Sequence, residues 1–172
     1  MQKISLVLIL TCLIHTSIAQ KDNQVVIGTI DSVHSNILNE TRKIWVYVPN
    51  RNNSLYGSQN YPVIYLLDGD GHFHSVTGLI HQLSSVNGNA IIPEMIVVGI
   101  PNTDRTRDLT PTHSMEGPDG KEMSFLTSSG GGENFTSFLE KELIPYVEAH
   151  YPTAPHRILI GHSFGACLLS IP

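Results

Sequence analysis

The residues best suited to chemistry lie near the end of the 172-residue sequence, in the run Gly161-His162-Ser163-Phe164-Gly165. This G-x-S-x-G pattern follows an apolar run that predicts a strand, and it precedes an apolar stretch that predicts a helix. A serine at such a turn is held clear of the sheet, and the glycines relieve crowding in the strained backbone. The start of the following helix stabilises negative charge that develops beside the serine. The pattern predicts a nucleophile at Ser163, with an ordinary Gly/Ser turn as the alternative.

Five segments have the composition of strands that could position this serine. Residues 24–31 and 41–48 are rich in β-branched and aromatic side chains, which predicts an antiparallel pair. Residues 63–67, 95–100 and 157–160 are continuous apolar runs, which are typical of strands buried on both faces.

Helices are expected between these strands. In residues 73–83, Val76, Leu79, Ile80 and Leu83 share one helical face. Residues 133–150 have an i, i+3, i+4 apolar pattern, in which Pro145 should cause a kink or a tighter turn. Buried strands that alternate with helices predict an α/β fold, with a mostly parallel sheet and helices on both faces.

The first residues have the pattern of a leader rather than of a folded element. Residues 1–19 combine Lys3, an apolar run and small residues before a cleavage point between Ala19 and Gln20, which predicts a cleaved signal peptide. The protein is therefore expected to be secreted or periplasmic, without stable membrane insertion after cleavage. Residues 20–172 are expected to belong to a single domain.

Composition narrows the possible partners. Ten Lys and Arg residues against fifteen Asp and Glu residues give a net charge of −5, which argues against nucleic-acid binding. Cleavage at Ala19 would leave Cys167 as the only thiol, and we expect it to be a small buried apolar side chain. His72 and His74 could supply two metal ligands, but no third ligand is evident, so neither a metal nor a cofactor is expected.

Four segments carry a resemblance to a known family. Residues 62–69 (PVIYLLDG), 96–102 (IVVGIPN), 105–111 (RTRDLTP) and 160–165 (IGHSFG) resemble an esterase branch of the α/β-hydrolase superfamily. That branch includes esterase D and the enterochelin-type siderophore esterases. The resemblance implies an α/β-hydrolase fold and a serine carboxylic-ester hydrolase that acts on a small-molecule ester through an acyl-enzyme on Ser163. It also implies an oxyanion hole made by the backbone N–H groups of Phe164 and Asp70.

The order of the catalytic residues in that superfamily raises a further expectation. The acid and the histidine of the triad follow the serine along the chain, so we expect both to lie beyond residue 172. The chain then corresponds to the N-terminal part of an esterase domain, truncated after the serine turn. His72, His74 and His113 lie on loops that could approach the site, but nothing in their spacing marks one as the base. A secreted binding module that keeps the hydrolase fold without the chemistry is the alternative.

The segment 101–132 has neither helical nor strand periodicity, and a loop of this length in a compact domain is usually functional or disordered. It follows a strand whose carboxyl end should lie at the same edge of the sheet as the serine turn, where open α/β sheets bind ligands. Arg105 and Arg107 in this loop are therefore expected to bind substrate, with solvated surface charges as the alternative. The sequence leaves the oligomeric state open.

Overall fold

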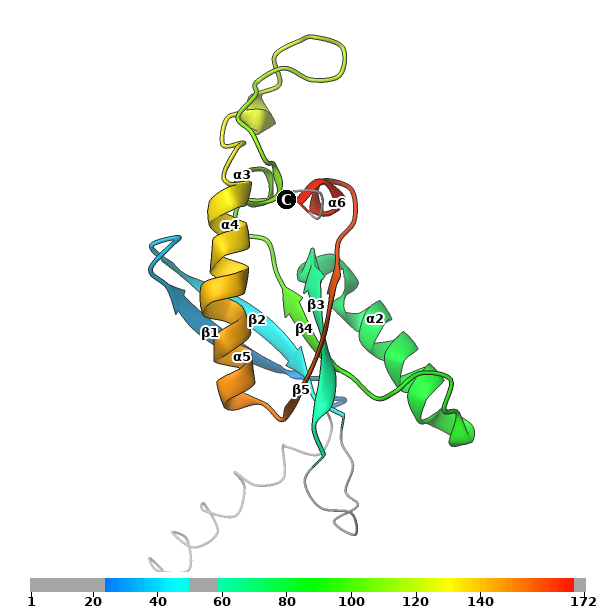
Figure 1. The fold of residues 1–172 in the computed structure, drawn as a ribbon. Coiled ribbons are helices and arrows are strands. Elements are labelled where there is room, and N and C mark those ends of the chain that lie inside the picture. Colours follow the sequence, from blue (N-terminus) through cyan, green and yellow to red (C-terminus); the bar gives the residue numbers. More distant parts are fainter. Residues whose placement is uncertain (1–23, 50–58, 169–172) are drawn as a thin grey trace, which may run out of the picture.

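A five-stranded sheet forms the centre of the protein in this computed structural model, which describes residues 24–49 and 59–168 (Figure 1). The strand order is β1-β2-β4-β3-β5, with bounds β1 Thr29–Ser35, β2 Glu40–Tyr47, β3 Tyr61–Leu67, β4 Ile96–Ile100 and β5 Thr153–Ile160. The β1–β2 pair is antiparallel, as predicted, but β1 begins five residues later than the expected strand 24–31, and residues 24–28 precede it without strand pairing. β2 also pairs with β4 in an antiparallel manner, whereas β3 is parallel to both β4 and β5. The sheet is thus mixed, and the expected mostly parallel arrangement holds only for β4, β3 and β5.

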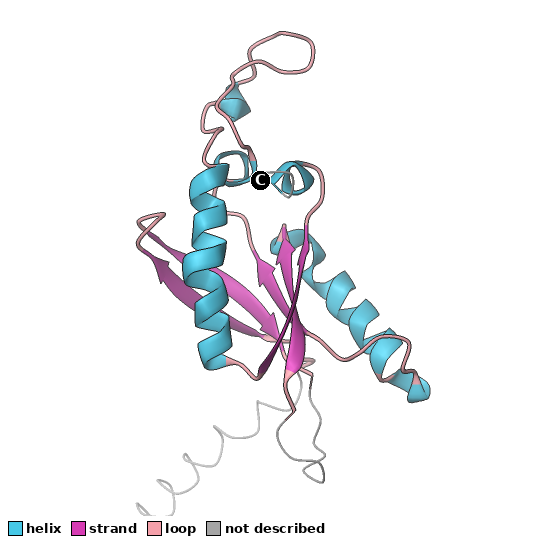
Figure 2. Ribbon diagram, in the orientation of Figure 1, coloured by secondary structure: helices cyan, strands magenta, loops and turns pink. Residues whose placement is uncertain are grey.

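Helices cover both faces of the sheet, which confirms the predicted fold class (Figure 2). Alternate residues of β3 divide the core. Val63, Tyr65 and Leu67 pack under α4 and α5, and Ile64 and Leu66 pack under α2. The helical elements are α2 Gly69–Ser84, η3 Val86–Gly88, α3 Arg105–Leu109, η4 Ser124–Leu126, α4 Gly132–Phe138, η5 Leu139–Leu143, α5 Ile144–His150 and α6 Phe164–Leu168. No helix within these described residues combines the length and apolar character needed to cross a membrane. The predicted leader, 1–19, lies outside the described residues.

Helix α2 differs from its prediction in its start and its buried face. It begins at Gly69 rather than residue 73, and Phe73, Thr77, Ile80 and Ser84 face the sheet. Leu79, expected on the buried face, is 57% exposed. The reason is where the Phe73 ring packs. It lies so close to Gly99 of β4 that a Cβ atom on this glycine would be only 2.8 Å from the ring. The ring therefore packs directly on glycine backbone and sets the rotation of the helix.

The long helix that packs on the other face contains a wide turn instead of the predicted kink or tighter turn. Residues Leu139–Leu143 form a π turn between α4 and α5. Pro145 has no N–H, so the carbonyl of Lys141 lacks its α-helical partner and the helix widens just before this proline.

The π turn presents Glu142 to the β1–β2 hairpin. Its carboxylate accepts hydrogen bonds from the hydroxyl of buried Ser35 and from the backbone N–H groups of Asn36, at 2.9 Å, and Ile37, at 3.3 Å. Burial alone would raise the pKa of Glu142, but these hydrogen bonds outweigh it and hold the pKa below its usual value. The carboxylate therefore fixes the hairpin turn to the helix.

The turn from β5 to α6 is built on two glycines that pack against each other. A Cβ on Gly161 would lie 2.7 Å from the carbonyl carbon of Gly165, and a Cβ on Gly165 would lie 3.2 Å from Leu67 Cδ1. The strand leading into the turn was expected to be buried on both faces, but its last residues, Leu159 and Ile160, are 39% and 37% exposed. The reason is that β5 is the edge of the sheet in the described part of the chain.

Cys167, in α6, was expected to be buried and is exposed. The described part of α6 directs Gly165 and Leu168, rather than the cysteine, toward the core.

We predict that Glu142→Gln lowers the free energy of unfolding by about 1 kcal/mol at neutral pH, because the amide accepts fewer and weaker hydrogen bonds from the hairpin. The native pKa of Glu142 is depressed, so the stabilisation is present at neutral pH and is lost as the pH falls through that pKa. Urea titrations should show the gap to the unmutated protein closing below about pH 4. Glu140→Gln, at a neighbouring exposed glutamate, is the matched control, and an equal effect of both changes would contradict the assignment.

We also predict that Gly161→Ala lowers the free energy of unfolding by about 1–3 kcal/mol, because its methyl group would overlap the backbone of Gly165. Thermal unfolding measures the effect. Gly78→Ala is the control, since a Cβ there meets nothing within 4 Å on an exposed stretch of α2, and helix propensity should make it neutral or stabilising by up to about 1 kcal/mol. Equal stability of the two variants would disprove the close packing of the turn.

Candidate active site

Ser163 occupies the turn between β5 and α6 in a strained conformation. Its φ angle is 55°, in the left-handed region that non-glycine residues rarely adopt. The turn closes through hydrogen bonds from Gly165 N to the carbonyl of His162, at 2.9 Å, and from Ala166 N to the carbonyl of Ser163, at 2.8 Å. Ser163 is exposed, and the turn from β5 to α6 lies at the edge of the sheet where the carboxyl ends of β3, β4 and β5 meet (Figure 1). These are the backbone features that nucleophile elbows share.

Polar side chains link the end of β3, which pairs with β5, to the end of the neighbouring strand β4. Asp68, which follows β3, is buried and has a φ angle of 53°. Asn102, which follows β4, donates from Nδ2 to Asp68 Oδ1 at 2.8 Å and to Asp70 Oδ1 at 3.0 Å. The backbone N–H of Asn102 also donates to Asp70 Oδ1, at 3.2 Å. The turn after β3 is therefore bound to the turn after β4.

Arg105 extends this link to the serine turn. Its Nε donates to Asp68 Oδ1 at 2.6 Å, and its Nη2 donates to Asp68 Oδ2 at 3.0 Å and to the carbonyl of His162 at 3.2 Å. The guanidinium carbon lies 5.2 Å from the centre of the Phe164 ring, which is a cation–π distance. The hydrogen bonds from Arg105 and Asn102 hold the pKa of Asp68 below its usual value, although burial acts in the opposite direction. Asp68 is therefore a carboxylate at neutral pH.

Arg107 belongs to a different cluster. Its Nε donates to Asp108 Oδ1 and its Nη2 to Glu40 Oε1, both at 2.7 Å. Buried Arg42 pairs with the same two acids, at 2.6 Å to Asp108 Oδ2 and 2.8 Å to Glu40 Oε1. The hydrogen bonds from Arg107, followed by those from Arg42, lower the pKa of Glu40 despite its burial. This four-residue cluster anchors α3 to β2.

The two arginines expected at the site thus face different parts of the molecule. Arg105 faces the serine turn and Arg107 faces the β1–β2 hairpin. The segment 101–132, expected to lack regular structure, contains α3 and η4, and α3 packs against α6. Substrate contact by Arg105 and Arg107 stays a prediction.

The two expected oxyanion donors lie at the first residues of helices. Asp70 is the second residue of α2, and Phe164 is the first residue of α6. Such N–H groups have no partner within their own helix and are free to bind an anion. Asp70 is also held through its side chain by Asn102. Their assignment as oxyanion donors stays a prediction.

The histidines near the serine turn in sequence or space have different neighbours. The rings of His72 and His162 lie edge to face with their centroids 6.0 Å apart, beside Ser163. His113 is engaged elsewhere, with Nδ1 3.0 Å from the carbonyl of Ser129. No hydrogen bond joins a histidine ring to the serine within the described residues. Nor do those residues include three His, Cys, Asp or Glu side chains grouped closely enough to hold a metal ion.

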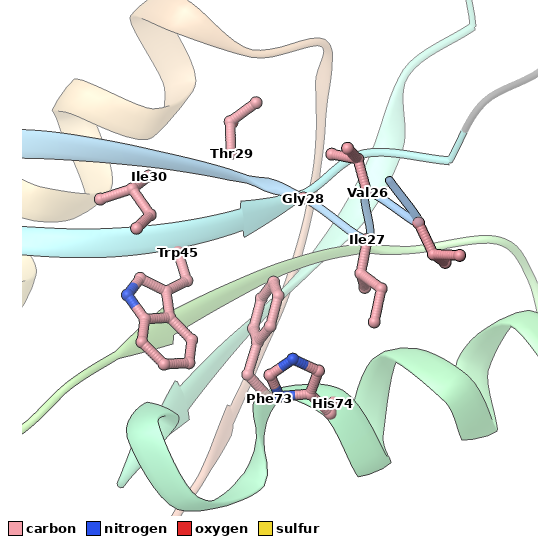
Figure 3. Close-up of a pocket in the computed structure, with 9 residues that line it drawn as sticks. Val26, Ile27, Gly28, Thr29, Ile30, Trp45, Phe73 and His74 are labelled. Atoms are coloured by element: carbon pink, nitrogen blue, oxygen red, sulfur yellow. The ribbon is translucent and has the colours of Figure 1, made fainter. Parts of the chain in front are cut away.

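A separate apolar pocket of about 350 Å³ lies between the β1–β2 hairpin and α2 (Figure 3). Trp45, Phe73 and His74 form an aromatic wall, in which the centroid of the Trp45 ring lies 5.7 Å from that of Phe73. Residues 25–30 form the other wall. None of the residues of the serine turn lines this pocket, and sequence patterns do not single it out because its walls come from three distant segments.

The sequence of the chain matches known esterases. The family model Esterase, described as "Putative esterase", matches residues 35–168. The chain is 36% identical over 117 residues to the ferri-bacillibactin esterase BesA of Bacillus subtilis, which covers 61% of this chain and 39% of that protein. It is 31% identical over 127 residues to the apo-salmochelin esterase of Escherichia coli, which covers 72% of this chain and 39% of that protein.

Solved structures show the same relationship. The crystal structure of an IroE-like serine hydrolase from Shewanella oneidensis matches with a TM-score of 0.76 and 37% identity, over 82% of this chain and 44% of that one. The siderophore hydrolase EstA from Aspergillus nidulans shares the fold with a TM-score of 0.65 at 23% identity, over 86% of this chain and 53% of that one. The chain spans 39% of the length of the two curated relatives. With the family match extending from β1 to α6, the chain belongs to the esterase family of α/β-hydrolases.

Proposed function

We propose that this chain carries the nucleophile of a serine carboxylic-ester hydrolase and that its substrates are siderophore esters. The observation that carries the proposal is Ser163, exposed with a φ angle of 55° between a strand of the parallel part of the sheet and the following helix. Membership of the esterase family supports the ester-hydrolase part. The siderophore part is supported by the names of the relatives, which are esterases of ferri-bacillibactin and apo-salmochelin.

The proposed reaction is acyl transfer in two steps. Ser163 Oγ attacks the carbonyl carbon of the ester and loses its proton to a base, and the bond to the alcohol oxygen breaks as that oxygen takes up a proton. The backbone N–H groups of Phe164 and Asp70 stabilise the oxyanion of each tetrahedral intermediate. Water then attacks the acyl-enzyme and releases the acid. We propose that the acid and the histidine base follow Ser163 along the chain and lie beyond residue 172, because this is the order of the triad in the superfamily.

We predict that Ser163→Ala lowers the hydrolysis of a short p-nitrophenyl ester by at least about 10³-fold, since removing a triad member has effects of this size or larger. The assay uses the protein as its gene encodes it. The same variant should lose covalent labelling by a fluorophosphonate probe. Ser32→Ala, at an exposed serine of β1, should behave like the unmutated protein. Retained hydrolysis in Ser163→Ala would contradict the assignment of Ser163 as the nucleophile. If the unmutated protein is folded but shows neither hydrolysis nor labelling, the non-catalytic binding module is favoured.

We further propose that the protein is exported and that its leader is cleaved between Ala19 and Gln20. The pattern of residues 1–19 supports this, with its early lysine, apolar run and small residues before the cleavage point. Mass spectrometry of the exported protein should find Gln20 as the first residue. A bulky residue in place of Ala19 should block cleavage and leave the precursor uncut. Recovery of the uncleaved chain as the main exported form would contradict the proposal.

A further inference from the structure

Arg105, in the segment after β4, contacts both the turn after β3 and the turn that carries Ser163. It binds the Asp68 carboxylate through two nitrogens, the carbonyl of His162 through one of them, and the face of the Phe164 ring. We infer that Arg105 is a positioning residue, which fixes the separation between the two halves of the oxyanion hole. The inference rests on the proposed function, because it assumes that the N–H groups of Asp70 and Phe164 hold the oxyanion.

The first half of the hole is fixed through Asp68. The parallel pair of hydrogen bonds from Nε and Nη2 of Arg105 orients the plane of this carboxylate. The backbone of Asp68 is equally constrained, since its carbonyl accepts hydrogen bonds from the N–H groups of Gly71, at 2.9 Å, and His72, at 3.1 Å. Asp70 lies between these residues, so holding Asp68 in place also constrains the backbone turn that carries the Asp70 N–H.

The second half is fixed through the serine turn. The carbonyl of His162, which directly precedes Ser163, accepts from Arg105 Nη2 at 3.2 Å and from Gly165 N at 2.9 Å. The Phe164 ring packs under the guanidinium group. Because one planar group binds both halves, it holds the serine and the Phe164 N–H at a set distance from the turn after β3.

The orientation of the Arg105 guanidinium group favours a positioning role over direct contact with the substrate. The edge formed by Nε and Nη2 points at the protein, and all the hydrogen bonds of Arg105 with described residues come from that edge. Misplacement of reacting groups by about 1 Å can cost about 10²-fold in rate, and loss of one oxyanion donor costs about 10²–10³-fold. Loss of Arg105 should therefore reduce kcat, with little effect on KM for an uncharged ester.

The test compares Arg105→Met and Arg105→Lys with the unmutated protein. On a neutral p-nitrophenyl ester we expect kcat to fall about 100-fold in Arg105→Met and about 10-fold in Arg105→Lys, with KM within about threefold. The second-order rate of fluorophosphonate labelling should fall by similar factors, because its phosphonyl oxygen occupies the same hole. Arg157→Met is the matched control, since this arginine lies on β5 and pairs with Glu148 without contacting the serine turn. It should leave kcat and the labelling rate unchanged.

Other outcomes would overturn the inference. A raised KM with unchanged kcat would make Arg105 a substrate contact, and unchanged kcat in both variants would exclude a positioning role. Thermal unfolding identifies a variant that does not fold. If Arg105→Met does not fold, the single variants Asp68→Asn and Arg105→Lys test the positioning role through the same kcat and labelling rates. If Ser163→Ala is inactive while the Arg105 variants are normal, only the inference fails. If hydrolysis does not depend on Ser163, the proposed function fails and the inference fails with it.

Discussion

The ion pair between Asp68 and Arg105 is the interaction on which the arrangement of the site depends. Asp68 directly follows β3, and Arg105 lies beyond β4. The same guanidinium group donates to the carbonyl of His162, in the turn after β5. Backbone hydrogen bonds hold these strands along their length, but not where they leave the sheet. A carboxylate that is largely buried also has to be paired, because burying an unpaired charge costs several kcal/mol. Pairing of the Asp68 carboxylate therefore holds the three strand ends together.

This pair depends in turn on the anchoring of the short helix α3, which carries Arg105. Five residues do not form a stable helix alone. The helix is held by Asp108, which is 2% exposed and receives hydrogen bonds from Arg42 of β2 and from Arg107. Asp104 caps the helix by accepting from the N–H of Arg107 at 2.9 Å. Arg107 thus stabilises helix α3, which positions Arg105. The two arginines lie at opposite ends of a series of contacts that runs from the β1–β2 hairpin to the serine turn.

Local sequence patterns were sufficient for the central strands and for the serine turn, but not for the mixed direction of the sheet. The apolar runs around Leu66 and Val98 predicted β3 and β4, and the spacing of Gly161 and Gly165 predicted the tight turn at Ser163. What they could not predict depends on partners far away in the chain. The short helix α3 has no periodicity of its own, and its arginines have carboxylate partners 37 and 67 residues earlier. The face of α2 is likewise set by glycine backbone on another strand, which no helical pattern reveals.

The π turn before Pro145 has a consequence for how relatives should be aligned with this chain. The buried apolar side chains of the long helix are Phe135, Phe138, Leu139, Leu143 and Val147. If one residue were removed after Leu139, they would be spaced i, i+3, i+4, i+7 and i+11, which is the pattern of a plain amphipathic α-helix. The wide turn therefore absorbs one extra residue without changing which side chains face the sheet. A relative that shows a single-residue gap here could keep the same core, and the gap alone would not mark a lost element.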